Sequence, residues 1–214
     1  MPARPLNSLV ALAFTVGGGL FALGAAIAQV GSGDAATSAS IYLAGGAFFS
    51  TGGYGSVLQA VNFPPGAAAE SAGGWRWLRY EPTRPGWLAA FVLFVGTLAF
   101  AISLVSAFIE GLDAQQTNRL IWAPEITGCV LFLLSGHFAF AALRLAGRRP
   151  RLDDLAWWVA GVNQLGSVLF FLAGLAAFTR PLTDSIVNVD LANWGTFSGA
   201  VCFALGGVLQ AFER

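Results

Sequence analysis

The chain has 214 residues, of which 56% are hydrophobic and only 10% are charged. Roughly 25% of the residues in an average soluble protein are charged, so this composition excludes an ordinary soluble domain. The 11 basic residues are all arginines and are balanced by 11 acidic residues, so we expect no basic patch of the kind that binds nucleic acid. Both cysteines, Cys129 and Cys202, lie in apolar stretches, which argues against a disulfide framework.

Six apolar segments are long enough to cross a membrane. A helix rises about 1.5 Å per residue, so crossing a hydrocarbon core of about 30 Å takes about 20 apolar residues. The predicted spans, in chain order, are residues 8–29, 41–62, 88–110, 126–147, 155–178 and 193–212. No acidic residue falls in the interior of a predicted span. The charged residues Glu110 and Arg144 lie near enough to the span ends to reach the headgroups. The sequence predicts an all-α membrane protein in one transmembrane domain, residues 1–214.

The first span has a second interpretation. Arg4, an apolar run and the small residues before Gln29 are also typical of a secretory signal peptide with its cleavage site. The apolar run is longer than the ~7–15 residues of a signal peptide, and the segment shares a repeat with the other spans. These features favour a retained span, and cleavage stays the alternative.

The connection 63–87 is the one long loop that we expect. It begins with Pro64 and Pro65, and its second half gathers aromatic and arginine side chains from Trp75 to Tyr80. Such a mixture is typical of the membrane interface, where rings meet the acyl chains and guanidinium groups meet phosphates. The pair Trp157 and Trp158 has the same interpretation. The loops 30–40, 111–125 and 179–192 are short and polar, so we expect no extra domain on that side.

The fourth span contains the one histidine, His137, beside Ser135. A serine and a histidine in a membrane suggest an intramembrane serine protease of the rhomboid type. Residues i and i+2 point about 200° apart on a helix, however, so His137 cannot take a proton from Ser135. The sequence has no second histidine that could act as the base for Ser135. Zinc needs three or four Cys, His or carboxylate ligands, and the spans do not supply them. We therefore expect no catalytic residue, metal site or cofactor.

Polar side chains at membrane depth are the remaining candidates for a site. His137 lies near the midplane of the fourth span, Asn163 and Gln164 lie a third of the way into the fifth, and Gln59 and Gln210 lie nearer the span ends. Unpaired polar groups in hydrocarbon cost free energy, so we expect these side chains to face the bundle interior. They are either interhelical hydrogen-bonding groups or the lining of a ligand or conduction path. We favour the structural interpretation for His137.

The arginines predict the orientation, because cytoplasmic loops retain positive charge. Nine of the 11 lie on one side of the six-span arrangement, and Arg119 and Arg180 lie on the other. This distribution predicts that both termini are cytoplasmic. The nine are Arg4, Arg76, Arg79, Arg84, Arg144, Arg148, Arg149, Arg151 and Arg214.

Every span repeats one motif: a small residue, a phenylalanine four positions later, and a second small residue three positions further. Offsets of 0, 4 and 7 fall on one helical face, so each helix presents small residues around one ring, which permits close packing in lipid. The first small residues of paired spans lie 28 (17 to 45), 32 (96 to 128) and 33 (166 to 199) residues apart, which predicts three related helical hairpins. The motif residues are Gly17, Phe21, Gly24; Gly45, Phe49, Gly52; Gly96, Phe100, Ser103; Gly128, Phe132, Ser135; Gly166, Phe170, Ala173; and Gly199, Phe203, Gly206.

Several stretches also carry a resemblance. They are residues 162–170, 193–203 and 45–62, residues 95–97 after Trp87, and Trp122, Pro124 and Glu125 before Gly128. Together they resemble an uncharacterised family of bacterial integral membrane proteins, and the hairpins are more loosely similar to the two-helix YrhK-type membrane domain. The resemblance covers the chain from about residue 41. It implies the architecture and brings no activity or ligand.

Three classes of function remain. A structural or accessory protein of the cell membrane that interacts with lipids is favoured. A transporter or channel with a polar site around His137 is the alternative, although coupled transport usually needs an ionisable group in the membrane and helices interrupted by proline or glycine. Here His137 has no carboxylate to partner it, and all nine prolines lie outside the span interiors. An intramembrane enzyme comes third. Lipids are the expected partners, and a partner membrane protein or a second copy of the chain is left open.

Overall fold

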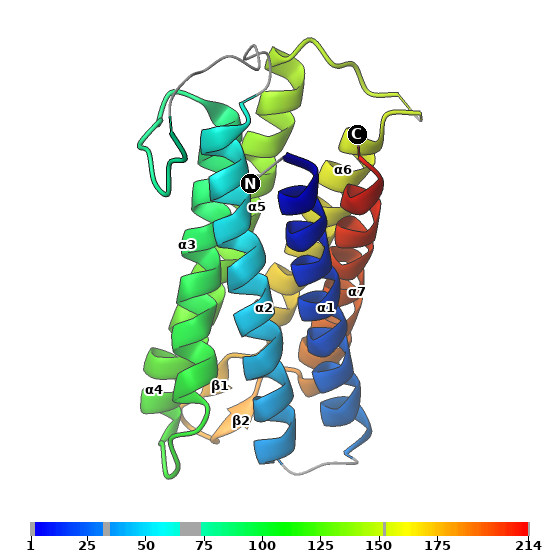
Figure 1. Cartoon of the computed structure of the whole chain (residues 1–214). Helices are drawn as coiled ribbons and strands as arrows, with labels where there is room; N and C mark the ends of the chain where they lie inside the picture. Colours follow the sequence, from blue (N-terminus) through cyan, green and yellow to red (C-terminus); the bar gives the residue numbers. More distant parts are fainter. Residues whose placement is uncertain (1–2, 32–34, 65–73, 152, 214) are drawn as a thin grey trace.

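The protein, represented by a computed structural model, folds into an upright bundle of long helices (Figure 1). The structure describes residues 3–31, 35–64, 74–151 and 153–213. Parts of two predicted loops, residues 32–34 and 65–73, and the terminal Arg214 lie outside the described residues. The long helices are α1 (Ala3–Val30), α2 (Ala35–Asn62), α3 (Pro85–Ser106), α5 (Ala123–Leu145), α6 (Leu155–Ala176) and α7 (Val189–Phe212).

Five helical segments are long and apolar enough to cross a membrane, so the prediction of a helical protein suited to a membrane is confirmed at this level. They are Arg4–Val30, Pro85–Ser106, Ala114–Leu145, Leu155–Ala176 and Val189–Phe212. Helix α2 is as long as α1, with 28 residues each, but is not among the five. Its sequence is rich in glycine, serine and threonine, which lower its hydropathy.

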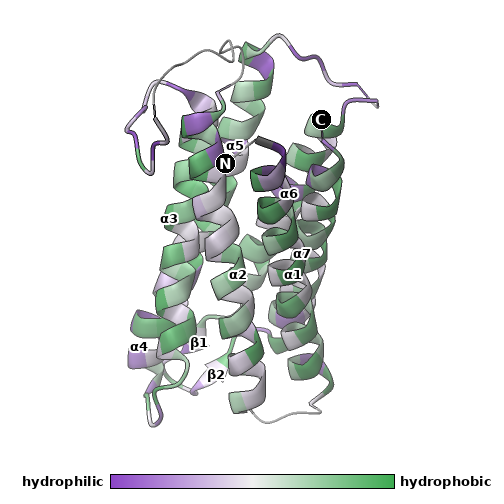
Figure 2. Cartoon of the chain, in the orientation of Figure 1, coloured by the Kyte–Doolittle hydropathy of each residue, from purple (hydrophilic) through white to green (hydrophobic). Residues whose placement is uncertain are grey.

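The six long helices form a closed ring. Each packs against the next long helix in the chain, and α1 packs against α7 to complete the circuit. Large apolar side chains such as Leu98, Ile102 and Leu165 are exposed on the outside. In Figure 2 the apolar residues predominate in the middle of the helices, and the polar residues lie mostly near the helix ends and in the loops. This pattern suits contact with lipid on all sides of the ring.

The segment before the fourth predicted span is helical, which corrects two boundaries. Helix α4 (Ala114–Thr117), a π-helical turn η1 (Asn118–Trp122) and α5 form one continuous helix, where the sequence predicts a loop over 111–125. Asp113 starts it with a capping box, since its side chain accepts from Gln116 N and the Gln116 side chain accepts from Asp113 N. The wide turn precedes Pro124, whose ring would clash with a carbonyl in a regular helix. Glu125 therefore lies inside this helix, whereas the predicted fourth span begins after it.

The predicted loop 179–192 contains the strands of a small antiparallel hairpin, β1 (Thr179–Arg180) and β2 (Ser185–Ile186). The Asn118 side chain donates to Thr179 O at 2.6 Å and accepts from Thr179 N at 3.0 Å, which fixes the hairpin to η1. The Arg180 guanidinium donates to the carbonyl oxygens of Ile186 and Val187. The sequence predicts a short polar loop here and does not predict its strands.

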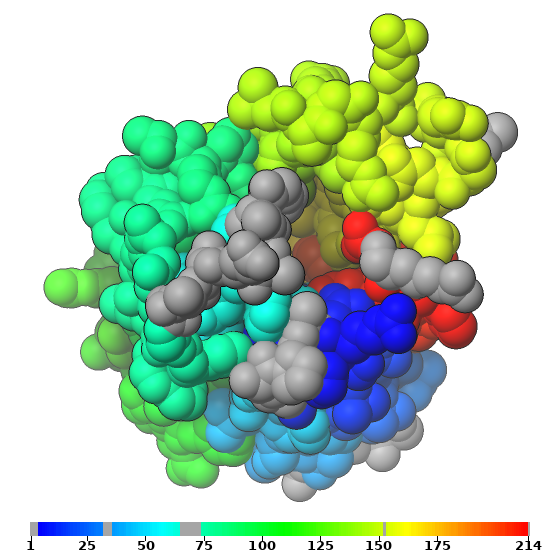
Figure 3. Space-filling view, turned by 45° about the horizontal axis from the view of Figure 1, so that its top comes forward, coloured from blue at the N-terminus to red at the C-terminus, as the bar shows by residue number. Residues whose placement is uncertain are grey.

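The two ends of the bundle differ in charge. Both chain ends, the described part of the 63–84 connection and the 146–154 connection lie at one end (Figures 1 and 3). The described arginines follow this division, since only Arg119 and Arg180 belong to elements at the opposite end. At the terminal end Trp77, Leu78 and Tyr80 are exposed. The Asn62 side chain donates to Arg76 O at 2.8 Å and accepts from Arg76 N at 2.9 Å, which holds this segment against α2.

Candidate functional site

The phenylalanines of the repeat meet in the middle of the ring. Phe21, Phe100 and Phe170, from α1, α3 and α6, form one triangle with ring centroids 5.9 to 6.4 Å apart. A second triangle unites the phenylalanines of α2, α5 and α7 with centroids 5.2 to 6.1 Å apart, and it consists of Phe49, Phe132 and Phe203.

Three further contacts join the triangles: Phe21 with Phe49, Phe100 with Phe132, and Phe170 with Phe203, at 6.1, 5.2 and 5.2 Å. The six rings thus occupy the corners of a triangular prism, which we call the phenylalanine prism. All six side chains are buried.

Glycines make the prism possible. In each helix pair α1/α2, α3/α5 and α6/α7, the first glycine of one motif lies against the phenylalanine of the other helix. A Cβ atom at Gly17 would come within 3.0 Å of the Phe49 ring, and one at Gly45 within 3.1 Å of the Phe21 ring. The other two pairs repeat this reciprocal contact: Gly96 with Phe132, Gly128 with Phe100, Gly166 with Phe203, and Gly199 with Phe170.

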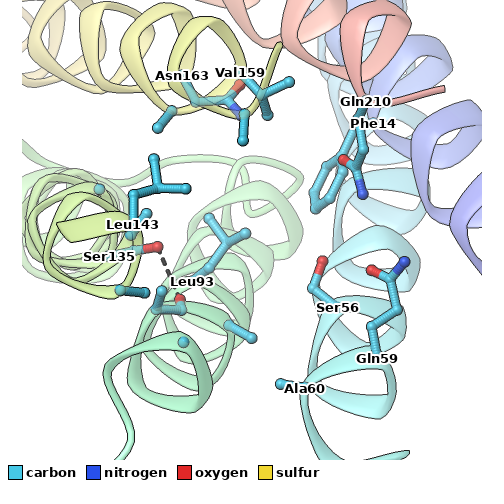
Figure 4. Close-up of a pocket in the computed structure, with 18 of the residues that line it drawn as sticks. Phe14, Ser56, Gln59, Ala60, Leu93, Ser135, Leu143, Val159, Asn163 and Gln210 are labelled. Atoms are coloured by element: carbon cyan, nitrogen blue, oxygen red, sulfur yellow. Dashed lines mark hydrogen bonds between the residues drawn. The ribbon is translucent and has the colours of Figure 1, made fainter. Parts of the chain in front are cut away.

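A cavity lies between the phenylalanine prism and the end of the bundle that carries the chain termini. Its volume is about 420 Å³, and it is lined by side chains from all six long helices. Phe49, Phe132 and Phe203 form its floor, while the other prism triangle is not part of its lining. Figure 4 shows Phe14 of α1, Leu93 of α3, Val159 and Asn163 of α6 and Gln210 of α7 converging on this space. We call it the central cavity.

The three serine hydroxyls in the wall of the central cavity are already hydrogen-bonded to backbone carbonyls. The Ser135 hydroxyl donates to Ala89 O of α3 at 2.8 Å, and those of Ser56 and Ser167 donate to carbonyls one turn back in their own helices at 3.0 and 2.9 Å. Asn163 lies across the cavity from Phe14 in Figure 4. Among the described residues, no side chain or backbone hydrogen bond to the Asn163 amide group is formed, so this amide remains able to bind a ligand.

Charged residues lie at the mouth of the central cavity. Within the described lining, the charged side chains are Arg84 and Glu213. Arg84 pairs with Glu81 and also donates to Ala60 O at 3.3 Å, while Glu213 pairs with Arg148 at 3.5 Å. Both charges are therefore paired, and the wall below them is neutral.

Outside the mouth lies a wider vestibule of about 1020 Å³, which shares Gln59, Phe63, Ala156 and Glu213 with the central cavity. Its charged lining residues are three arginines and three acids: Arg4, Arg148, Arg151, Asp153, Asp154 and Glu213. Arg148 also pairs with Asp154 at 3.2 Å, and Arg151 pairs with Asp153 at 3.1 Å. The described lining of the vestibule therefore carries as many positive as negative charges.

The structure separates the candidate residues of the sequence. Asn163, Gln59 and Gln210 line the central cavity. His137 does not, because its side chain is exposed on the outer face of α5. The expectation that His137 faces the bundle interior is therefore wrong. Gln164 lies at the α5/α6 contact, with its side chain packed over Gly136. Its Oε1 atom is buried and has no hydrogen-bond partner among the described residues.

Two polar residues that the sequence does not single out as site candidates lie close to the central cavity or the phenylalanine prism. Asn7, one residue before the predicted first span, bonds to Gln59 and Gln210 at the mouth of the central cavity. Glu125 lies on the far side of the phenylalanine prism, partly buried and close enough to Tyr42 and Cys129 to interact with them electrostatically. The helical periodicity could have identified both residues, because each falls on the side of its helix that carries the motif.

The remaining chemistry-bearing groups form no cluster in the part of the chain that the structure describes. Cys129 is buried and its thiol donates to Phe170 O at 3.4 Å, while Cys202 is half-buried on another helix. No three His, Cys, Asp or Glu side chains among these residues are placed to hold a metal ion. The arrangement therefore offers hydrogen bonds and apolar surface to a ligand.

Comparison with protein-family models, curated proteins and solved structures finds no match. The resemblance to a family of bacterial membrane proteins stays a prediction. Any functional conclusion for this chain depends on its own geometry.

Proposed function

We propose that the chain crosses the cell membrane six times, as three related helical hairpins with both termini in the cytoplasm. Helix α2 counts as a span in this proposal, because it packs between α1 and α3 in the ring and its small residues serve close packing. The same reciprocal glycine and phenylalanine contact in three helix pairs supports a common origin of the hairpins. The excess of arginines at the terminal end supports the orientation.

We further infer that the protein is a membrane-embedded binding protein for a small, uncharged and largely apolar molecule. The central cavity carries this proposal. Its volume of about 420 Å³ lies within the range of about 300–1,000 Å³ that is usual for small-molecule sites. An apolar wall with a few polar groups, as found here, is also usual for such sites. Because the cavity opens towards the terminal end, the molecule would enter from the cytoplasmic side.

The same geometry favours binding over conduction. Six buried rings close the path below the central cavity, and the small space that five of these rings form with Gly46 and Thr97 has a volume of only about 10 Å³. Coupled transport usually relies on a charged group in the pathway, and the described wall of the cavity below its mouth is neutral. Because His137 lies on the outer face of α5, the hypothesis of a transporter with a polar site around His137 loses its support.

The test fills the central cavity with a larger side chain. Leu93 points into the cavity, and Leu98 on the same helix is 45% exposed on the outside. In lipid nanodiscs, the uncharged fluorophore 1-aminoanthracene should bind the wild-type chain saturably, above the signal of empty nanodiscs. Leu93→Trp should abolish this binding and Leu98→Trp should preserve it.

Thermal unfolding of both variants provides the control for folding. Absence of saturable binding to the wild-type chain would refute the proposal. It would equally fail if a folded Leu93→Trp variant bound the fluorophore as well as the wild type does.

A further inference from the structure

Three amide side chains meet at the mouth of the central cavity, and we call them the amide cluster. They are Asn7 of α1, Gln59 of α2 and Gln210 of α7. Asn7 Oδ1 accepts from Gln59 Nε2 at 3.0 Å and from Gln210 Nε2 at 3.2 Å. Asn7 Nδ2 donates to the backbone carbonyl of Gln210 at 2.9 Å. The cluster thereby joins the first, second and last helices of the ring.

The orientation of all three amides follows from one atom. A backbone carbonyl can only accept a hydrogen bond, so the Asn7 atom that contacts Gln210 O must be the amide nitrogen. The other Asn7 atom is then a carbonyl oxygen, which also can only accept. Both glutamines must therefore turn their NH₂ groups towards Asn7. A flip of either glutamine would place two carbonyl oxygens against each other.

This arrangement leaves two hydrogen-bond acceptors free. No described residue donates to Gln59 Oε1 or Gln210 Oε1, and neither oxygen is fully buried. Both residues line the central cavity, and Figure 4 shows both side chains on its wall. The mouth thus offers a ligand two amide carbonyl oxygens, held in place by their bonds to Asn7.

We propose that the amide cluster selects a ligand that is a neutral hydrogen-bond donor, such as a long-chain alcohol or primary amide. This inference depends on the proposed function, since it names the chemistry of the molecule in the central cavity. Gln210 follows Phe203 by seven residues and Gln59 follows Phe49 by ten, so the acceptors lie about 10–15 Å above the prism floor. The donor end meets the amide cluster while the apolar body lies on Phe49, Phe132 and Phe203.

Charge at the donor end is disfavoured. An anionic head would face two carbonyl oxygens, whose lone pairs repel it. A cationic head could donate to the oxygens but would find no free counter-charge, because Glu213, the acid in the described cavity lining, is already paired with Arg148. A neutral donor binds these oxygens without breaking an ion pair: a primary amide has two N–H groups and can satisfy both, whereas a hydroxyl has one and satisfies one of them.

The experiment measures how a ligand protects a cysteine in the central cavity. Val159 points into the cavity in Figure 4, so Val159→Cys in a Cys202→Ala chain should react with a water-soluble methanethiosulfonate reagent, while the buried Cys129 stays unmodified. The probes are decan-1-ol, a donor, and decyl methyl ether, which has a comparable chain and can only accept. In nanodiscs, decan-1-ol should protect at a concentration about three- to tenfold lower than the ether.

Methionine replacements test the acceptors directly. Gln59→Met and Gln210→Met keep the length of the side chain and remove its carbonyl oxygen. Because a hydroxyl donates a single hydrogen bond, the two replacements together should weaken protection by decan-1-ol about three- to tenfold and leave the ether unchanged, and each alone should have no larger effect. Gln29→Met is the matched control, because Gln29 bonds to Asp190 at the opposite end of the bundle. Leu143→Cys, at a second position in the cavity lining, serves if Val159→Cys fails to fold.

The outcomes separate the two proposals. Equal protection by the alcohol and the ether, or no effect of the two glutamine replacements made together, would overturn the inference and leave the binding cavity standing. An unreactive cavity cysteine in a folded chain, or no protection by either probe, would overturn the proposed function and the inference with it.

Discussion

Three consecutive glycines in α1 give a sharp test of the packing, because each faces different surroundings. A Cβ atom at Gly17 would come 3.0 Å from Gly45 O and from Phe49 N of α2. At Gly18 it would come 2.7 Å from Ala204 N and 2.9 Å from Ala200 O of α7. At Gly19 it would meet nothing within 4 Å. One substitution, glycine to alanine, therefore probes two interfaces and an open face at adjacent positions.

The expected magnitudes follow from these distances. Overpacking costs about 1–3 kcal/mol, and alanine regains up to about 1 kcal/mol of helix propensity relative to glycine. Gly18→Ala forces backbone atoms of α7 to move, so it should lower the free energy of unfolding by about 1–2 kcal/mol. Gly17→Ala meets slightly longer contacts and should cost less. Gly19→Ala should be neutral or stabilising by up to about 1 kcal/mol.

The assay is reversible unfolding of the purified chain in mixed micelles, titrated with dodecyl sulfate and followed by tryptophan fluorescence. The free energies of unfolding should fall in the order Gly19→Ala, Gly17→Ala, Gly18→Ala. The packing argument is refuted if Gly19→Ala destabilises as much as Gly18→Ala, or if Gly18→Ala is neutral.

Three further predictions use the same chain. Ser135→Ala removes the bond to Ala89 O and should cost about 0.6 kcal/mol in that titration, whereas Thr127→Ala, whose hydroxyl bonds within its own helix, is the control that should cost less. His137→Leu should change the free energy of unfolding by less than about 0.5 kcal/mol, because the side chain is exposed, and a larger loss would contradict its outward position. In intact cells, Thr183→Cys in a Cys202→Ala chain should react with an impermeant maleimide and Arg149→Cys should react only after permeabilisation. The reverse labelling would contradict cytoplasmic termini.

The motif faces were predictable from the sequence because helical geometry is local. Offsets of four and seven residues place Phe21 and Gly24 on the same face as Gly17 whatever surrounds the helix. Lipid offers no hydrophobic gain for burying a ring, so a face of small residues beside each ring predicts contact with another helix. The structure places all six phenylalanines in that contact.

The same geometry also contained the correction for His137. It follows Gly128 by nine residues, which at about 100° per residue turns it about 180° from the motif face. Asn163 precedes Gly166 by three residues and stays within about 60° of it. Depth in the membrane indicates how costly a polar group is, while the angle decides whether it can reach the interior.

What only the tertiary structure decided is how the three helix pairs meet. A periodic pattern states which face packs, but it does not state the partner, because any small-residue face can approach any other. Closure of the ring by α1 and α7 brings the six rings into one prism and leaves the central cavity above it. It also brings Asn7 to Gln210, which lie at opposite ends of the chain and share a hydrogen bond only because the ring closes.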